Sequence, residues 1–209
     1  MHGSINHQVN LVFTKSGIFQ PGQSKHQAKQ EARAELAKQG LSATSDKLAE
    51  RTAIYSYETA SKYKDTWHDL AHYAKQEYGL KDITKLESEH IKGYLGQRIA
   101  EGIKYSSFQR ECAAISKFEQ ALNKFAQEVG DKYGASKSEF SFREAIESTR
   151  EIAKETLSRD LRDRGFENAR EVINNISRPE SKIAASVQYE GGARISEACY
   201  IKENQLKGY

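Results

Sequence analysis

The chain has 209 residues, of which 37% are hydrophobic and 29% charged, and its formal net charge is +3. This length allows one large or two small domains, and the polar composition excludes a fibrous or membrane protein, because no apolar stretch reaches spanning length. Two distant cysteines exclude a disulfide framework and a zinc site, and a charge of +3 does not by itself indicate nucleic-acid binding. No secretion signal opens the chain, so we expect a cytoplasmic protein. We also expect no metal and no cofactor.

The first 44 residues predict an arm followed by a short helix. Only two prolines occur in the whole chain, so long stretches can be helical and we predict an all-α fold. The apolar run Val9–Phe13 favours an arm or a short strand-like segment. Residues 24–38 are rich in helix formers, with Ser24 as a helix cap and Gly40 as a stop.

Three amphipathic helices are predicted next, over residues 56–78, 88–100 and 106–129, and the third stops at Gly130. Each carries apolar residues at three- and four-residue spacing, which is the period of one helix face. The stripes consist of Tyr63, Trp67, Leu70, Ala71, Ala74 and Tyr78, then Ile91, Leu95 and Ile99, and finally Ile115, Phe118, Leu122, Phe125 and Val129. Together these helices predict a small bundle in a domain of residues 45–133.

A linker is predicted over residues 131–138, because this stretch lacks apolar periodicity and carries glycine and serine. Residues 134–209 are therefore predicted to form a second, separate helical part. It contains a charged helix over 142–161, another from about 166 to 176, and a third over 181–189 that leads to a pair of glycines.

The sequence that follows the last of these helices resembles the first conserved box of tyrosine recombinases. In that box, an apolar helix and a tight glycine turn precede Gly-(Leu/Ala)-Arg-(Ile/Val)-Ser-Glu, and residues 192–197, Gly-Ala-Arg-Ile-Ser-Glu, fit every position. The stretch 200–206 takes the place of the usual Leu-x-Trp-x-Asp pattern but lacks its tryptophan. A glycine allows the turn, and the planar guanidinium of Arg194 can hold two oxygens of a phosphodiester.

Three earlier patterns of the same family occur in the same order. They are Thr59 to Tyr63, then Ile83 to Leu95 with Leu86, Glu89, Ile91 and Tyr94 in matching positions, and then Ser106 to Arg110. The resemblance covers roughly residues 45–206 and leaves the first forty or so outside. It implies a helical core-binding (SAM-like) domain over 45–133, followed by the first helices of a truncated catalytic domain over 134–209.

The resemblance also implies a function. Members of the family are site-specific recombinases that integrate and excise DNA at attachment sites through a phosphotyrosine intermediate. It assigns Arg194 as the first catalytic arginine, with Glu197 and Gly192 supporting the active site. The family's lysine, His-x-x-Arg pair and tyrosine nucleophile have no counterpart, since all six histidines precede Ile91, so we expect a DNA-binding fragment that is inactive alone.

Double-stranded DNA is the partner that the resemblance implies, with self-association on the DNA possible. The family presents the first and third helices of the bundle to the duplex, and polar residues off the apolar stripes of these helices can meet phosphates or bases. The candidates are Lys62, Lys64, Lys104, Tyr105, Ser106, Ser107, Arg110 and Lys117.

Two other interpretations stay open. The chain can be a non-catalytic regulator derived from a recombinase, which occupies recombinase sites, and the reading frame beyond Tyr209 would separate this case from a fragment. It can also be a helical interaction protein in which Gly-Ala-Arg-Ile-Ser-Glu arose by chance, and specific duplex binding would exclude that case.

Overall fold

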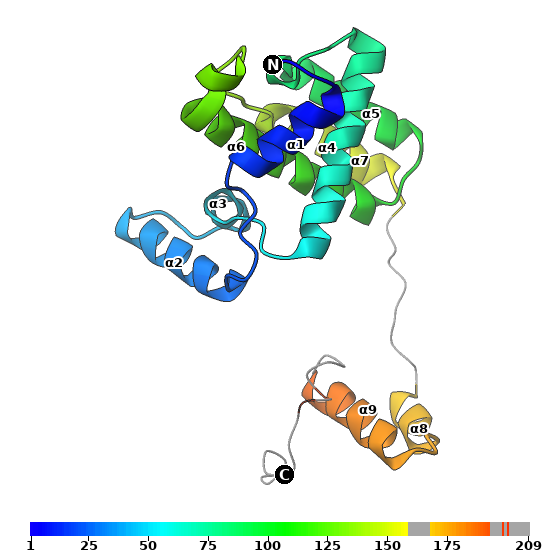
Figure 1. Cartoon of the computed structure of the whole chain (residues 1–209). Helices are drawn as coiled ribbons and strands as arrows, with labels where there is room; N and C mark the ends of the chain where they lie inside the picture. Colours follow the sequence, from blue (N-terminus) through cyan, green and yellow to red (C-terminus); the bar gives the residue numbers. More distant parts are fainter. Residues whose placement is uncertain (159–167, 193–197, 199, 201–209) are drawn as a thin grey trace. The chain divides into compact units, whose positions relative to one another are not determined.

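A computed structural model describes residues 1–158 and 168–192, together with Ala198 and Tyr200. The chain forms two compact units, Met1–Asp160 and Leu161–Tyr209 (Figure 1). The described residues are predominantly helical and contain no strand beyond one isolated bridge between Phe19 and Ile54, which confirms the predicted all-α fold. No helix among them is long and apolar enough to cross a membrane.

The first unit contains most of the helices. They are α1 (Ile5–Lys15), α2 (Lys25–Lys38), α3 (Ser45–Arg51), α4 (Tyr57–Tyr78), a 3-10 turn (Ile83–Lys85), α5 (Ser88–Ala100), α6 (Tyr105–Tyr133) and α7 (Arg143–Thr156). The predicted helices over 24–38, 56–78 and 88–100 are confirmed almost to the residue. Figure 1 shows α1, α4, α5, α6 and α7 gathered in one bundle.

The prediction of an arm or strand-like segment near the N-terminus is wrong, because this segment is α1. Ser4 caps the helix by accepting a hydrogen bond from the backbone of the third residue after it, at 3.2 Å. Ile5, Val9 and Val12 recur at four and three residues and are buried against α4 and α6. The wholly buried side chain of Gln8 bonds to the backbone on either side of residue 82. Thus α1 is a full member of the bundle.

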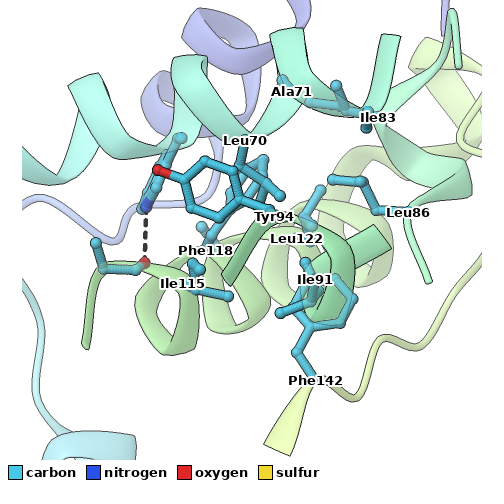
Figure 2. Packing of buried hydrophobic residues seen from close by; sticks show 14 of the residues in the cluster. Leu70, Ala71, Ile83, Leu86, Ile91, Tyr94, Ile115, Phe118, Leu122 and Phe142 are labelled. Atoms are coloured by element: carbon cyan, nitrogen blue, oxygen red, sulfur yellow. Dashed lines mark hydrogen bonds between the residues drawn. The ribbon is translucent and has the colours of Figure 1, made fainter. Parts of the chain in front are cut away.

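An aromatic pair lies where α4 meets α6. The indole of Trp67 is fully buried, donates from Nε1 to the carbonyl of Ala114 at 2.7 Å, and stacks on Phe118 with 4.7 Å between ring centroids. Burial with its N–H satisfied makes this indole a strong stabilising contact. Figure 2 shows the surrounding apolar side chains of the cluster, among them Leu70, Ile91, Ile115, Leu122 and Phe142.

The first unit extends beyond the predicted boundary at residue 134. Helix α6 continues through Gly130 to Tyr133, and Gly134 ends it with φ 66°, the left-handed region that glycine adopts without strain. The side-chain amide of Asn123 on α6 then donates to the Phe140 carbonyl at 2.9 Å and accepts from the Phe140 backbone N–H at 2.7 Å. Helix α7 packs on α5 and α6, so it belongs to the first compact unit, which ends at Asp160. The assignment of residues 134–209 to a catalytic domain stays a prediction.

Helices α2 and α3 form a small attachment to this bundle, with α3 unforeseen from the sequence. Ala32, Leu36 and Leu48 make a cluster of their own, separate from the main core. Arg51 at the end of α3 donates to the side chain of Gln39 at 3.1 Å, which ties the two helices together. The pair therefore packs around a small core of its own.

The second unit holds α8 (Ala169–Asn174) and α9 (Pro179–Gly191), close to where helices were predicted. The two helices pack on each other, and Arg170 pairs with Glu190 at 3.2 Å. Gly192 follows α9 with φ 62°, as the predicted glycine turn requires.

Candidate nucleic-acid interface

Two predicted DNA-binding lysines lie in the first half of α4. The side chain of Lys62 is half exposed and pairs with Glu58 one turn earlier. Lys64 lies with its ammonium 5.5 Å from the ring centroid of Phe13 in α1. A surface ion pair of this kind is worth little, so Lys62 can exchange its partner for a phosphate at small cost.

Five further predicted residues are brought together at the start of α6. Lys104 and Ser106 are exposed, Ser107 is half-buried, and the half-buried ring of Tyr105 lies parallel to that of Phe108. Arg110 follows on the next turn and is exposed. The first turn of α6 carries no acidic side chain, so the positive end of the helix dipole adds to the cationic groups there.

Lys117 does not belong to such a surface, and the prediction that it contacts DNA is corrected. Its side chain is buried, at 7% exposure, and its ammonium donates to the carbonyls of Ala49 and Thr52 and to Gln120 Oε1, the last at 2.8 Å. All three N–H donors of the lysine are used. Lys117 thus fastens the carboxyl end of α3 to α6, where the helix dipole favours a cation.

The environment of Lys117 is short of negative charge. Burial is the main cause that lowers the pKa of its ammonium to about 8, and the charges of Lys124 and Lys25 lower it further. The carboxylate of Glu50 acts in the opposite direction. Burying the ammonium costs free energy, and the structural contacts that it makes outweigh this cost of desolvation.

A cavity of about 290 Å³ lies beside Lys117, between the α2–α3 pair and the start of α4. Lys25 and Lys29 of α2 and the hydroxyl-bearing residues Thr59 and Tyr63 of α4 line it. No aspartate or glutamate is among the lining residues. Sequence reasoning missed Lys25 and Lys29, although their four-residue spacing on a helix poor in large apolar residues places both on one face.

The start of α6 is held in place by a buried ion pair. The guanidinium of Arg98 on α5 donates to both oxygens of Glu111, at 2.8 to 3.2 Å, and Tyr94 Oη donates to the same carboxylate at 3.2 Å. Glu111 is 5% exposed and directly follows the exposed Arg110. This network sets the register of α5 against the part of α6 that carries the predicted DNA contacts.

The predicted catalytic residues Arg194 and Glu197 lie outside the described residues. The structure places their neighbour Gly192 at the end of α9, and its conformation fits the turn that the motif needs. Among the residues that the structure describes, no group of three or more His, Cys, Asp or Glu side chains could hold a metal ion.

A family model described as the phage integrase N-terminal SAM-like domain matches residues 48–124. The match runs from within α3 into α6 and leaves α1, α2 and α7 outside. The first unit thus contains a helical domain of a class that generally binds DNA. Residues 48–124 are therefore similar to this domain of phage integrases, the family that the motifs indicated. Neither the curated proteins nor the solved structures yielded a match to this chain.

Proposed function

We propose that this chain is the DNA-binding part of a site-specific tyrosine recombinase that integrates and excises DNA at attachment sites. The family match carries the proposal, because it includes α4 and much of α6, the two helices that the resemblance predicted to meet the duplex. The exposed cationic groups at the starts of α4 and α6 support it.

The binding mode that these groups favour is dominated by phosphate contacts. Lysine and arginine side chains neutralise backbone phosphates and release counterions, so the affinity falls steeply as salt rises. Lys62, Lys104 and Arg110 supply charge, and Ser106 and Ser107 supply hydroxyl donors near the positive end of α6. Sequence discrimination would come from the subset that reaches base edges.

Fluorescence anisotropy with duplex DNA at increasing salt tests this interface. We expect binding that weakens steeply with salt, and we expect Arg110→Glu to weaken it at every salt concentration. Lys75→Glu is the matched control, because this exposed lysine lies in the last turn of α4, outside the predicted contacts. A chain that does not bind duplex at low salt, or that binds with equal affinity at all salt concentrations, would refute the proposal.

For the chemistry, we propose that Arg194 clamps the scissile phosphate during attack by a tyrosine, as the family resemblance implies. A bidentate guanidinium stabilises the charge that builds on the phosphate oxygens in the transition state. The sequence offers a motif match for this arginine and none for the nucleophile or the His-x-x-Arg pair. We therefore expect the 209-residue chain to bind DNA without forming a covalent adduct.

Trapping on a nicked attachment site would test this division of tasks. The 209-residue chain should give no protein–DNA adduct, and adduct from it would contradict the proposal. In a protein that also carries the missing groups, Arg194→Lys should strongly lower adduct yield and leave duplex binding nearly unchanged, because lysine keeps the charge but not the bidentate geometry.

A further inference from the structure

The cavity beside Lys117 gathers positive charge that the fold compensates only in part. Lys25 and Lys29 lie one turn apart on α2, and among the described residues neither has a hydrogen bond or an ion pair with another side chain. The buried ammonium of Lys117 adds a third charge at the wall, with all its donors already engaged. Glu50 compensates this charge in part but does not line the cavity.

Hydrogen-bond donors complete the wall on the side of α4. Thr59 Oγ1 accepts a hydrogen bond from the Ser56 hydroxyl at 2.7 Å, so its own proton is available to a ligand. The hydroxyl of Tyr63 has no hydrogen-bond partner in the part of the chain that the structure describes, and burial raises its pKa, so it stays a donor at neutral pH. The N-terminus of α4, a 22-residue helix, points its positive end toward the same region.

We propose that this cavity binds a phosphoryl group, supplied by the backbone of the bound duplex. Two lysine ammonium groups and two hydroxyl donors, with no acidic side chain in the wall, suit a tetrahedral dianion or a phosphodiester. The volume of about 290 Å³ has room for a phosphate together with an attached sugar. The inference deepens the proposed function, because it extends the DNA interface onto α2, outside the family match.

The position of the cavity favours the duplex over a free phosphorylated molecule as the source. Thr59 and Tyr63 line the cavity, and Lys62, a predicted DNA contact, lies between them on the second turn of α4. Residues three or four apart on a helix are neighbours, so a backbone strand held by Lys62 runs past the cavity mouth. A free phosphorylated ligand shares this chemistry and is the alternative that the experiment separates.

The test compares two double variants of the 209-residue chain with equal loss of charge. Lys25→Gln/Lys29→Gln removes both lysines of the cavity, whereas Lys38→Gln/Lys81→Gln removes two exposed lysines that do not line it. The slope of log affinity for duplex DNA against log salt is measured for each by anisotropy. Each lost phosphate contact should make the slope shallower by about 0.9. We expect a shallower slope by one to two such steps for the cavity variant and no change for the control.

Calorimetric titration with inorganic phosphate and with pyrophosphate, in the absence of DNA, forms the second arm. If the slope is unchanged but phosphate or pyrophosphate binds and both lysines are needed, the cavity takes a free phosphorylated ligand and the phosphoryl chemistry stands. If the slope is unchanged and neither anion binds, the inference is overturned. If the unaltered chain fails to bind duplex at all, the proposed function fails, and the titration alone then decides the cavity.

Discussion

Replacing Arg98 by methionine removes the cation from a buried carboxylate and should cost this fold a large share of its stability. The guanidinium contacts both oxygens of Glu111, which is 5% exposed, and also pairs with Glu101 at the surface. Methionine keeps most of the aliphatic length, so packing around the stem changes little. Among the described residues, Tyr94 is then the remaining side-chain donor to the carboxylate, which cannot be solvated where it lies.

The size of the effect follows from the burial of Glu111. Removing one partner of a buried ion pair leaves an uncompensated charge and costs about 3 to 5 kcal/mol. Glu111→Gln should cost about 1 to 2 kcal/mol, since the amide still accepts from Tyr94 and the partly exposed guanidinium keeps Glu101. In the double variant no buried charge remains, so its cost should fall short of the sum of the two by about 2 kcal/mol.

Urea unfolding followed by the fluorescence of Trp67 measures these values. Trp67 is the only tryptophan of the chain and is fully buried in the first unit, so its signal reports this unit alone. Glu101→Gln serves as control for the exposed half of the contact and should cost less than about 1 kcal/mol. A loss below about 1 kcal/mol for Arg98→Met, or simple additivity in the double variant, would show that the pair does not hold α5 on α6.

Two more stability predictions rest on single residues. Gly93→Ala should destabilise the fold by about 1 to 2 kcal/mol, because a Cβ there would lie 2.5 and 2.6 Å from the hydroxyls of Tyr78 and Tyr73. Gly96→Ala meets open space and should stabilise the fold by about 0.5 to 1 kcal/mol. Equal effects of the two substitutions on urea unfolding would contradict this reasoning. For Lys117, the folded pKa of about 8 lies below its ordinary 10.5, so the unfolded chain binds more protons between these values and stability due to this group rises with pH. Relative to Lys117→Met, the unaltered chain should therefore gain up to about 3 kcal/mol between pH 8 and 10.5, and a difference that stays constant with pH would refute the burial argument.

Regular apolar stripes made the centre of the fold predictable from the sequence. Helices α4 and α5 appear with the expected bounds. Helix α4 ends at the left-handed Gly79, and the left-handed Gly102 follows the last cap residue of α5. The stripe that contains Trp67 is buried except at Tyr63 and Tyr78, and the stripe that contains Phe118 is buried except at Val129. Periodicity identifies which face is buried because burial is what selects the spacing.

Contacts between distant segments explain the errors. Gly130 and Gly134 are both glycines that could end the helix, but α6 continues through Gly130 and ends at Gly134. The last turn is held by Tyr133, which stacks on Phe125 with 5.8 Å between ring centroids. Lys117 lies off the apolar stripe of α6, so the sequence alone predicts a surface residue. In the fold, its ammonium donates to two carbonyls at the end of α3, a contact that no local pattern indicates. The apolar run in α1 was short enough to suggest a strand, although Ile5, Val9 and Val12 already had helical spacing.

Neighbouring residues on α6 divide stability from recognition. Successive side chains on a helix point about 100° apart, so Glu111 faces α5 and is buried while Arg110 faces solvent. A change at Arg110 alters the surface charge that a phosphate meets and leaves the core contacts intact, whereas a change at Glu111 disturbs the register of the helix that presents Arg110. Because the ion pair fixes this register, the exposed groups at the start of α6 are already positioned before DNA arrives, and binding need not supply the ordering free energy.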